Sequence, residues 1–241
     1  VRYDDKGQRF EMAMVNVQAG DETQYDVNNG PRTWFFAGGT GGLGRVISRH
    51  LAQHSKTRII LVGRRPLDSS IRNQMAELKE LGAQAWYRQA DCRRLNDVQE
   101  VVEWAEQAVG PITHVAHAIG KIDDSYLLKK DAQSFTQVFE TKALSAINLD
   151  LATAQSPVSL FATFSSIAAV IPNQGQADYA MGNAFLDHFA VWRQDQVVSG
   201  MRSGGSLSLN LPSLAEGGIG VSPREQALLR EEFGMNPLPS T

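Results

Sequence analysis

The chain has 241 residues, 42% of them apolar, which is enough to bury one sizeable hydrophobic core. Its 23 basic and 26 acidic residues leave a net charge of −3 without long runs of one sign, so neither nucleic acid nor an anionic membrane is an expected partner. A single cysteine, Cys92, excludes an intramolecular disulfide and favours a cytoplasmic protein, and no stretch approaches the ~18 apolar residues of a membrane span. No metal site is predicted.

The first 30 residues differ from the rest of the chain. They are polar and mixed, and the weak alternation of apolar and polar residues from Phe10 to Val17 indicates a strand. An isolated strand of this kind needs partners to be stable. We therefore expect residues 1–30 to be the remnant of a preceding structural subdomain, and we interpret the sequence as a piece of a larger polypeptide.

From Thr33 onward, strand-like and helix-like segments alternate. Strands are predicted at residues 34–37, 58–62, 84–89, 112–118, 158–164 and 206–211, and helices after the first strand and at 69–81, 95–109, 132–154 and 177–193. Repeated strand–helix units predict a Rossmann-like α/β fold over residues 31–241, a doubly wound parallel sheet with helices on both faces. After Pro212, the glycine-rich run 216–220 and the helical pattern 223–233 predict a C-terminal lid.

A glycine-rich turn, residues 38–44, follows the first predicted strand directly. Glycine lets a pyrophosphate approach the backbone, and the helix N-terminus offers free N–H groups and the positive end of its dipole. The G-x-x-x-G-x-G spacing alone is weak, because such turns often only permit tight packing, but its place between strand and helix favours dinucleotide binding. The predicted cofactor-binding residues here are Gly38, Thr40, Gly42, Leu43 and Gly44.

The end of the second strand indicates which dinucleotide is bound. Enzymes that use NAD usually place Asp or Glu there, whereas this chain has Gly63, Arg64 and Arg65. Guanidinium groups suit the 2′-phosphate of NADPH, although two surface arginines can also follow a strand by chance. NADPH is the predicted cofactor.

Four side chains are predicted to form the reacting centre. Tyr179 would donate a proton to a carbonyl, and a nearby ammonium group, from Lys142, is expected to lower the pKa of its phenol. Ser166, at the end of the fifth strand, would orient the carbonyl, and Asn183, one helical turn after Tyr179, would hold a relay water. Each residue alone is more often structural, so the prediction depends on their occurring together.

These motifs resemble the ketoreductase domains of modular polyketide synthases, within the short-chain dehydrogenase/reductase superfamily. The similarity runs from about Thr33 to the end of the chain. Its motifs are the turn 38–44, Gly63-Arg64-Arg65, His117-Ala118-Ile119-Gly120, Phe164-Ser165-Ser166, Gly175-Gln176-Ala177-Asp178-Tyr179 and Asn183-Ala184-Phe185-Leu186-Asp187. Ordinary superfamily members carry Tyr-x-x-x-Lys, whereas here Asn183 takes the lysine position and Lys142 lies upstream, an exchange typical of these ketoreductases.

The resemblance implies hydride transfer from NADPH to a β-ketoacyl thioester on the phosphopantetheine arm of an acyl carrier protein. Neighbouring domains of a multienzyme synthase are then expected partners. Lys142 and Tyr179 would also contact the cofactor, and Asp91, Cys92 and Ala118 match further cofactor-binding positions. The run 127–130 and the expected lid resemble synthases whose acyltransferase acts in trans.

The resemblance also carries a prediction of stereochemistry. Ile122-Asp123-Asp124 matches the Leu-Asp-Asp signature of domains that give the R (D) alcohol, and position 171 is isoleucine where the opposite class has tryptophan. Asp123, Asp124 and Gln176 are therefore the predicted stereocontrol residues. The alternative is that the two aspartates only start a turn.

Several positions depart from the family pattern. Ala37 replaces a threonine, Ile119 an alanine, and residues 210–214 lack the usual tryptophans, which puts catalytic efficiency in doubt. Two other functions are compatible with the same motifs, a free-standing reductase and a scaffold that binds cofactor or carrier without turnover. The polar first 30 residues argue against the former, and the complete set of site residues argues against the latter.

Overall fold

The computed structural model describes residues 2–3, 9–10, 32–53, 57–214 and 230–231. The chain divides into two units, residues 1–30 and 31–241, which are described separately. In the first unit, β1 (Arg2–Tyr3) pairs antiparallel with β2 (Arg9–Phe10). Most of the strand predicted at 10–17, the glycine-rich run 216–220 and most of the lid helix predicted at 223–233 lie outside the described residues. Among the described residues, no helix combines the length and apolar character needed to cross a membrane.

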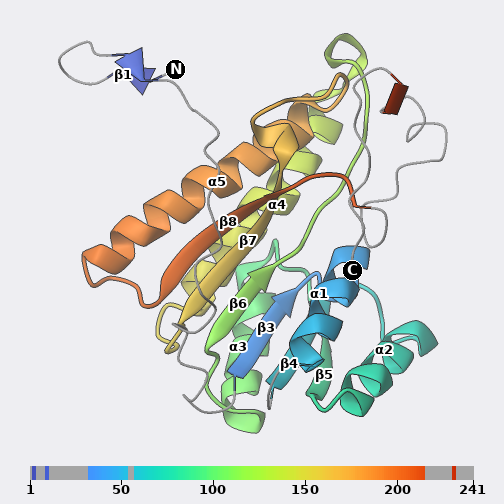
Figure 1. Cartoon of the computed structure of the whole chain (residues 1–241), viewed down its shortest axis with the longest axis vertical. Helices are drawn as coiled ribbons and strands as arrows, with labels where there is room; N and C mark the ends of the chain where they lie inside the picture. The colour runs from blue at the N-terminus through green and yellow to red at the C-terminus, as the bar shows by residue number, and fades with distance from the viewer. Residues whose placement is uncertain (1, 4–8, 11–31, 54–56, 215–229, 232–241) are drawn as a thin grey trace. The chain divides into compact units, whose positions relative to one another are not determined.

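The second unit alternates strands and helices, as predicted (Figure 1). Its elements are β3 (Arg32–Ala37), α1 (Gly42–Gln53), β4 (Thr57–Gly63), α2 (Ser69–Glu80), β5 (Gln84–Gln89), α3 (Leu95–Ala108), β6 (His114–His117), η2 (Leu127–Lys129), α4 (Ala132–Ala152), β7 (Leu160–Ser166), η3 (Ile167–Ala169), α5 (Ala177–Val198) and β8 (Gly205–Leu211). The last six strands pair in parallel in the order β5-β4-β3-β6-β7-β8. This confirms the predicted Rossmann-like sheet. The helix predicted to end near Arg193 is longer and ends at Val198, before Gly200 with its positive φ of 77°.

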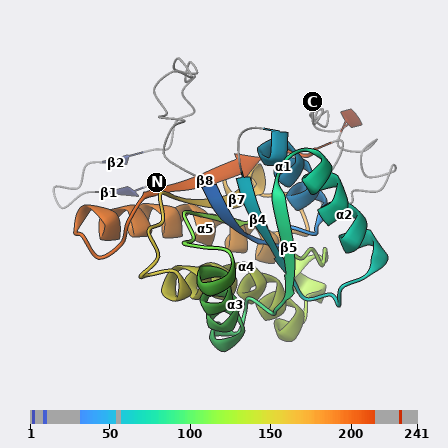
Figure 2. The same ribbon diagram turned by 90° about the horizontal axis from the view of Figure 1, so that it is seen from below.

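Helices cover both faces of the sheet (Figure 2). Apolar side chains from each face pack against the helices on that side, which gives two separate cores. Alternate residues of β3 separate to the two sides: Phe35 packs toward α3, α4 and α5, and Phe36 packs toward α1 and α2. Both phenyl rings are completely buried. On β8, Leu207 and Leu209 remain 43% and 36% exposed.

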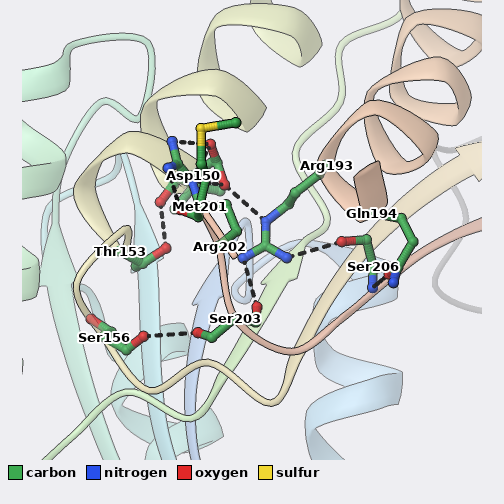
Figure 3. A network of polar contacts seen from close by, with 10 residues as sticks. Asp150, Thr153, Ser156, Arg193, Gln194, Met201, Arg202, Ser203 and Ser206 are labelled. Carbon is green, nitrogen blue, oxygen red and sulfur yellow. Dashed lines mark hydrogen bonds and ion pairs between the residues drawn. The ribbon is translucent and has the colours of Figure 1, made fainter. Parts of the chain in front are cut away.

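A buried ionic network holds the far ends of α4 and α5 together (Figure 3). The Asp150 carboxylate accepts a hydrogen bond of 2.8 Å from the Arg193 guanidinium, and both side chains are only 1% exposed. Arg202 approaches the second Asp150 oxygen at 3.0 Å, while Arg193 also donates to the Ser206 hydroxyl on β8. Because a buried charge is costly unless it is paired and hydrogen-bonded, this network fixes α4, α5 and β8 relative to one another.

A buried histidine makes the stability of this fold depend on pH. His117 is fully buried on β6, where burial and the nearby Lys142 ammonium lower its pKa from 6.5 to about 3. Its Nε2 lies 2.7 Å from the Ser145 hydroxyl. Below pH 6.5 His117 binds a proton in the unfolded chain, whereas in the folded chain it stays neutral down to about pH 3. The free energy of unfolding therefore falls as the pH falls from 6.5 to about 3.

We predict that the substitution His117→Gln reduces this loss of stability in acid. His117 lowers the free energy of unfolding by roughly 3 kcal/mol between pH 6.5 and pH 4. The reason is that one additional proton on the unfolded chain changes this free energy by about 1.4 kcal/mol per pH unit. Urea unfolding at several pH values measures the effect, and His188→Gln, on an exposed position of α5, serves as the control. Equal pH slopes for the parent protein and His117→Gln would contradict the prediction.

Candidate active site

The carboxyl ends of β3 and β6 form a crevice at the centre of the sheet. These two strands are neighbours, yet the helices that follow them, α1 and α4, lie on opposite faces, which makes this the topological switch point where open α/β sheets bind ligands. A pocket of about 410 Å³ opens there. Its lining residues are Gly38, Thr40, Gly41, Arg45, Gly63, Arg64, Arg65, Ala90, Asp91, Cys92, Arg93, Ala118, Ile119, Gly120 and Thr141.

The glycine-rich turn forms one wall of this pocket. Gly38 has φ = 77°, and a Cβ atom there would lie 2.6 Å from the Ala118 carbonyl oxygen, so a side chain cannot be accommodated. A Cβ on Gly44 would lie 2.6 Å from the Gly38 oxygen, so the first turn of α1 packs directly on the turn. Gly42 and Leu43 belong to this helical turn and, like Gly44, are not among the residues that line the pocket.

The two predicted arginines, Arg64 and Arg65, line the pocket directly after β4. The backbone carbonyl of Arg64 accepts a hydrogen bond of 3.0 Å from the Gln89 side-chain amide. The backbone carbonyl of Arg65 accepts a hydrogen bond from the Tyr87 hydroxyl. Both arginine side chains are exposed, and Arg65 lies 3.5 Å from the Asp68 carboxylate. The backbone is therefore fixed while the guanidinium groups stay accessible to an anion.

Asp91 and Cys92 line the same pocket but differ in charge: the Asp91 carboxylate is ionised, whereas the Cys92 thiol stays protonated. Arg93 binds the Asp91 carboxylate through both Nε and Nη2, at 3.0 and 2.6 Å, and this hydrogen bonding lowers the pKa of Asp91. Burial raises the pKa of the Cys92 thiol to about 12. The cysteine therefore acts as an inert wall residue, and Arg93 is a neighbour that the sequence analysis did not identify.

The structure brings the four predicted reacting residues together. None of them is among the residues that line the pocket, but Lys142 directly follows Thr141, which is. Lys142 on α4 is 4% exposed, and its Nζ lies 5.8 Å from the centroid of the Tyr179 ring on α5. The same ammonium donates a hydrogen bond of 3.1 Å to the Phe164 carbonyl on β7. The side chains of Ser166 and Asn183 lie close enough to the Tyr179 phenol to lower its pKa. Residues that are far apart in the sequence thus meet on three adjacent elements.

The electrostatics of this cluster differ from the expectation in one respect. Lys142 was expected to lower the pKa of Tyr179, but burial raises the pKa of this phenol above 10, against the opposing effect of the Ser166 and Asn183 side chains. Burial also lowers the pKa of Lys142, to about 8, while the Asp187 carboxylate acts in the opposite direction. For Tyr179, desolvation outweighs the effect of the two polar side chains, so the phenol remains protonated at neutral pH.

Asn183 has an unused polar atom in this site. Its side-chain nitrogen donates to the Tyr179 backbone carbonyl at 2.8 Å, whereas its side-chain oxygen is buried without a hydrogen-bond partner among the described residues. Buried amide oxygens rarely stay unpaired, and a bound water is the usual partner. The geometry therefore suits the predicted relay water.

Asp187 and Asn210 are two polar neighbours that the sequence analysis did not assign. Asp187 accepts hydrogen bonds from the Ser208 hydroxyl, at 2.6 Å, and from the Asn210 amide, at 2.8 Å. The Asn210 amide also donates to the backbone carbonyl of Ser166, at 3.3 Å. No spacing rule joins these residues of α5, β7 and β8, so only the folded chain reveals that they support the site.

The predicted stereocontrol residues lie where the loop before α4 meets the start of α5. The Gln176 amide donates a hydrogen bond of 2.9 Å to the Asp124 carboxylate, and the Asn173 amide donates to the Gln176 side-chain oxygen at 3.0 Å. Asp123 instead accepts from the Ser134 hydroxyl, and this hydrogen bond lowers the pKa of Asp123. Asp124 and Gln176 therefore act as a pair, while Asp123 belongs to the start of α4.

The parallel sheet with its glycine-rich turn and its tyrosine–lysine–serine cluster defines a short-chain dehydrogenase/reductase type of oxidoreductase. A solved reductase of this type from Mycobacterium ulcerans, 16% identical, has the same fold, with a TM-score of 0.77 over 87% of this chain and 78% of that one. Residues 33–215 match the family described as "KR domain". The chain belongs to this family, the ketoreductase domains of modular polyketide synthases.

The relatives are much longer than this chain. Polyketide synthase PksN of Bacillus subtilis (strain 168) is 32% identical over 98% of this chain, which spans only 4% of that protein. Erythronolide synthase EryA2 of Saccharopolyspora erythraea is 31% identical over 81% of this chain and 6% of its own length. A solved ketoreductase domain from the bacillaene assembly line is 29% identical, with a TM-score of 0.83 over 87% of this chain and 51% of that one.

We predict that Lys142 titrates near pH 8 in the free protein and that Asp187→Asn lowers this value. Removing the Asp187 charge removes the carboxylate that opposes desolvation, so the ammonium loses its proton at lower pH. The NMR shift of the lysine side-chain carbons, followed against pH, gives the pKa directly. An unchanged or higher pKa for Lys142 in Asp187→Asn would contradict this electrostatic account.

Proposed function

We propose that this domain reduces the β-keto group of an acyl thioester to the β-hydroxyacyl thioester with NADPH as the reductant. The observation that carries the proposal is the meeting of Lys142, Tyr179 and Ser166, with Lys142 directly after Thr141, which lines the pocket at the topological switch point. Such a cluster supplies a proton donor and a carbonyl-binding hydroxyl at one place.

Reduction needs a hydride at the carbonyl carbon and a proton at its oxygen. Bound NADPH supplies the hydride and its two electrons. Tyr179 donates its phenolic proton to the carbonyl oxygen, since burial keeps the phenol protonated at neutral pH. The hydroxyl of Ser166, which lies near the same phenol, holds the carbonyl oxygen against it.

Lys142 and Asn183 act on Tyr179 after it has given up its proton: Lys142 stabilises the phenolate, and Asn183 holds the water that returns a proton to it. A phenolate formed on Tyr179 is stabilised by the Lys142 ammonium 5.8 Å from the ring centroid, since a nearby positive charge favours the charged form of the phenol. The unpaired side-chain oxygen of Asn183 holds the water through which the phenolate is reprotonated. The raised pKa of Tyr179 describes the site without cofactor and substrate, where the phenol keeps its proton until the carbonyl oxygen takes it.

The residues present fit NADPH. Gly38, Thr40 and Gly41 line the pocket directly before α1, so phosphate groups bound there would face the N-terminal end of this helix. Arg64 and Arg65 line the same pocket with exposed guanidinium groups, which suit the 2′-phosphate. Ala118, Asp91 and Cys92 would surround the adenine and ribose portions.

The finer details of the substrate rest on the family resemblance. We propose a carrier-protein-bound substrate, because the relatives are multidomain polyketide synthases. The Ile122-Asp123-Asp124 signature and the isoleucine at position 171 support the R (D) product, and the run 127–130 supports a synthase with a trans-acting acyltransferase. A single free, buried cysteine is compatible with the reducing cytoplasm.

We predict that Tyr179→Phe lowers kcat for ketone reduction at least ~100-fold, as expected when a general acid is removed. The rate of NADPH oxidation with a β-ketoacyl thioester surrogate measures the effect. Val191→Ala, at a 62% exposed position of the same helix, is the control and should keep parent activity. Equal rates for Tyr179→Phe and the parent would overturn the assigned chemistry.

We also predict that Arg64→Ala/Arg65→Ala raises KM for NADPH by roughly 10- to 100-fold, the value of one or two lost charge-assisted hydrogen bonds. The KM for NADH, which lacks the 2′-phosphate, should change little. Steady-state kinetics with both cofactors decide between these outcomes. A parallel loss with both cofactors would instead mean that the arginines hold the fold of the pocket.

A further inference from the structure

Lys130 and Asp178 form an ion pair that the proposed chemistry does not use. The Lys130 ammonium lies 2.6 Å from the Asp178 carboxylate, and the two side chains are only 3% and 1% exposed. By contrast, Lys129, the preceding residue in the chain, is exposed. Surface ion pairs contribute little, but a buried pair is strongly coupled, because removing one partner leaves an uncompensated charge away from water.

The pair joins two segments on which the site depends. Asp178 lies in the first turn of α5, and its other carboxylate oxygen accepts a hydrogen bond of 2.9 Å from the backbone N–H of Tyr179. Lys130 lies one residue before the end of the segment between β6 and α4, residues 118–131, and its ammonium also donates to the backbone carbonyl of Asp123. One ammonium thus contacts the helix that carries Tyr179 and the turn that carries Asp123.

Two further contacts link the same segments but are weaker. The Gln176 amide donates to Asp124 at an exposed position, and the Ser125 N–H donates to the Gly175 carbonyl at 3.0 Å. A Cβ on Gly175 would lie 3.7 Å from Ser125, so the loop and the start of α5 are in close contact. Since an exposed hydrogen bond competes with water, whereas the ion pair is buried, the ion pair is the link whose geometry water disturbs least.

We propose that the Lys130–Asp178 ion pair is a positioning device that fixes the loop 118–131 against the N-terminus of α5 and so controls which face of the ketone is reduced. This inference rests on the proposed function. Neither residue has to touch the substrate, because the pair acts through Asp124, Gln176 and Tyr179. When both charges are absent, the loop separates more easily from α5 and the ketone can bind in either orientation.

The test uses the double variant Lys130→Met/Asp178→Asn, in which no buried charge is left unpaired. Neutralising both partners keeps stability close to that of the parent, whereas Lys130→Met alone leaves the Asp178 charge unpaired and lowers Tm. Lys129→Met is the matched control, since it changes the adjacent exposed lysine in the same way. Thermal unfolding first establishes that the double variant and the control are folded.

Two measurements then address the loop and the product. Amide hydrogen exchange is expected to increase at residues 121–130 and 175–178 of the double variant and to stay unchanged in β5. Chiral chromatography of the alcohol from a β-ketoacyl thioester surrogate is expected to show an enantiomer ratio reduced roughly tenfold, with kcat lowered as well. A misplacement of about 1 Å can cost ~100-fold in rate. Lys129→Met should match the parent in both measurements.

The outcomes separate this inference from the proposed function. Parent-like exchange in the folded double variant, or faster exchange with an unchanged enantiomer ratio, would overturn the positioning role while leaving the reductase assignment intact. Absence of NADPH oxidation in the parent itself would instead overturn the proposed function and the product part of this inference. The exchange data would then still decide whether the ion pair holds the loop.

Discussion

The buried ammonium of Lys142 is the constraint on which the rest of the site depends. A cation with 4% exposure must be compensated, and here the compensation comes from the Phe164 carbonyl, the Tyr179 ring and the more distant Asp187 charge. These groups belong to β7 and α5, while the lysine belongs to α4. The three elements must therefore keep one arrangement for the ammonium to remain charged beside the pocket.

The fold supplies that arrangement through two kinds of interaction at opposite ends of the helix pair. Near the site, the aromatic ring of Phe139 on α4 meets that of Phe185 on α5 edge-on, with centroids 5.8 Å apart. At the far end, the Asp150–Arg193 pair holds the same helices together (Figure 3). Apolar packing alone would tolerate sliding of one helix along the other, whereas a buried, hydrogen-bonded charge pair at one end restricts it.

Local patterns in the sequence were sufficient to predict the sheet, its helices and the positions of the glycine-rich turn, Lys142 and Tyr179. Periodicity and turn residues determine these features within short windows. Burial and pairings across the fold are not local. The direction of the Tyr179 pKa was predicted wrongly because desolvation depends on the packed surroundings, and the Lys130–Asp178 and Asp187–Asn210 contacts join residues on different elements. The roles of the site residues stay predictions, since geometry shows proximity and not turnover.

The position of Cys92 has a practical consequence. It is the chain's single cysteine, it is buried, and the pKa of its thiol is about 12, so almost no thiolate exists at neutral pH. Maleimide or iodoacetamide reagents will therefore react with a cysteine introduced on the surface and leave the native one untouched. Spin labels or fluorophores can be attached at chosen positions without first removing a native residue.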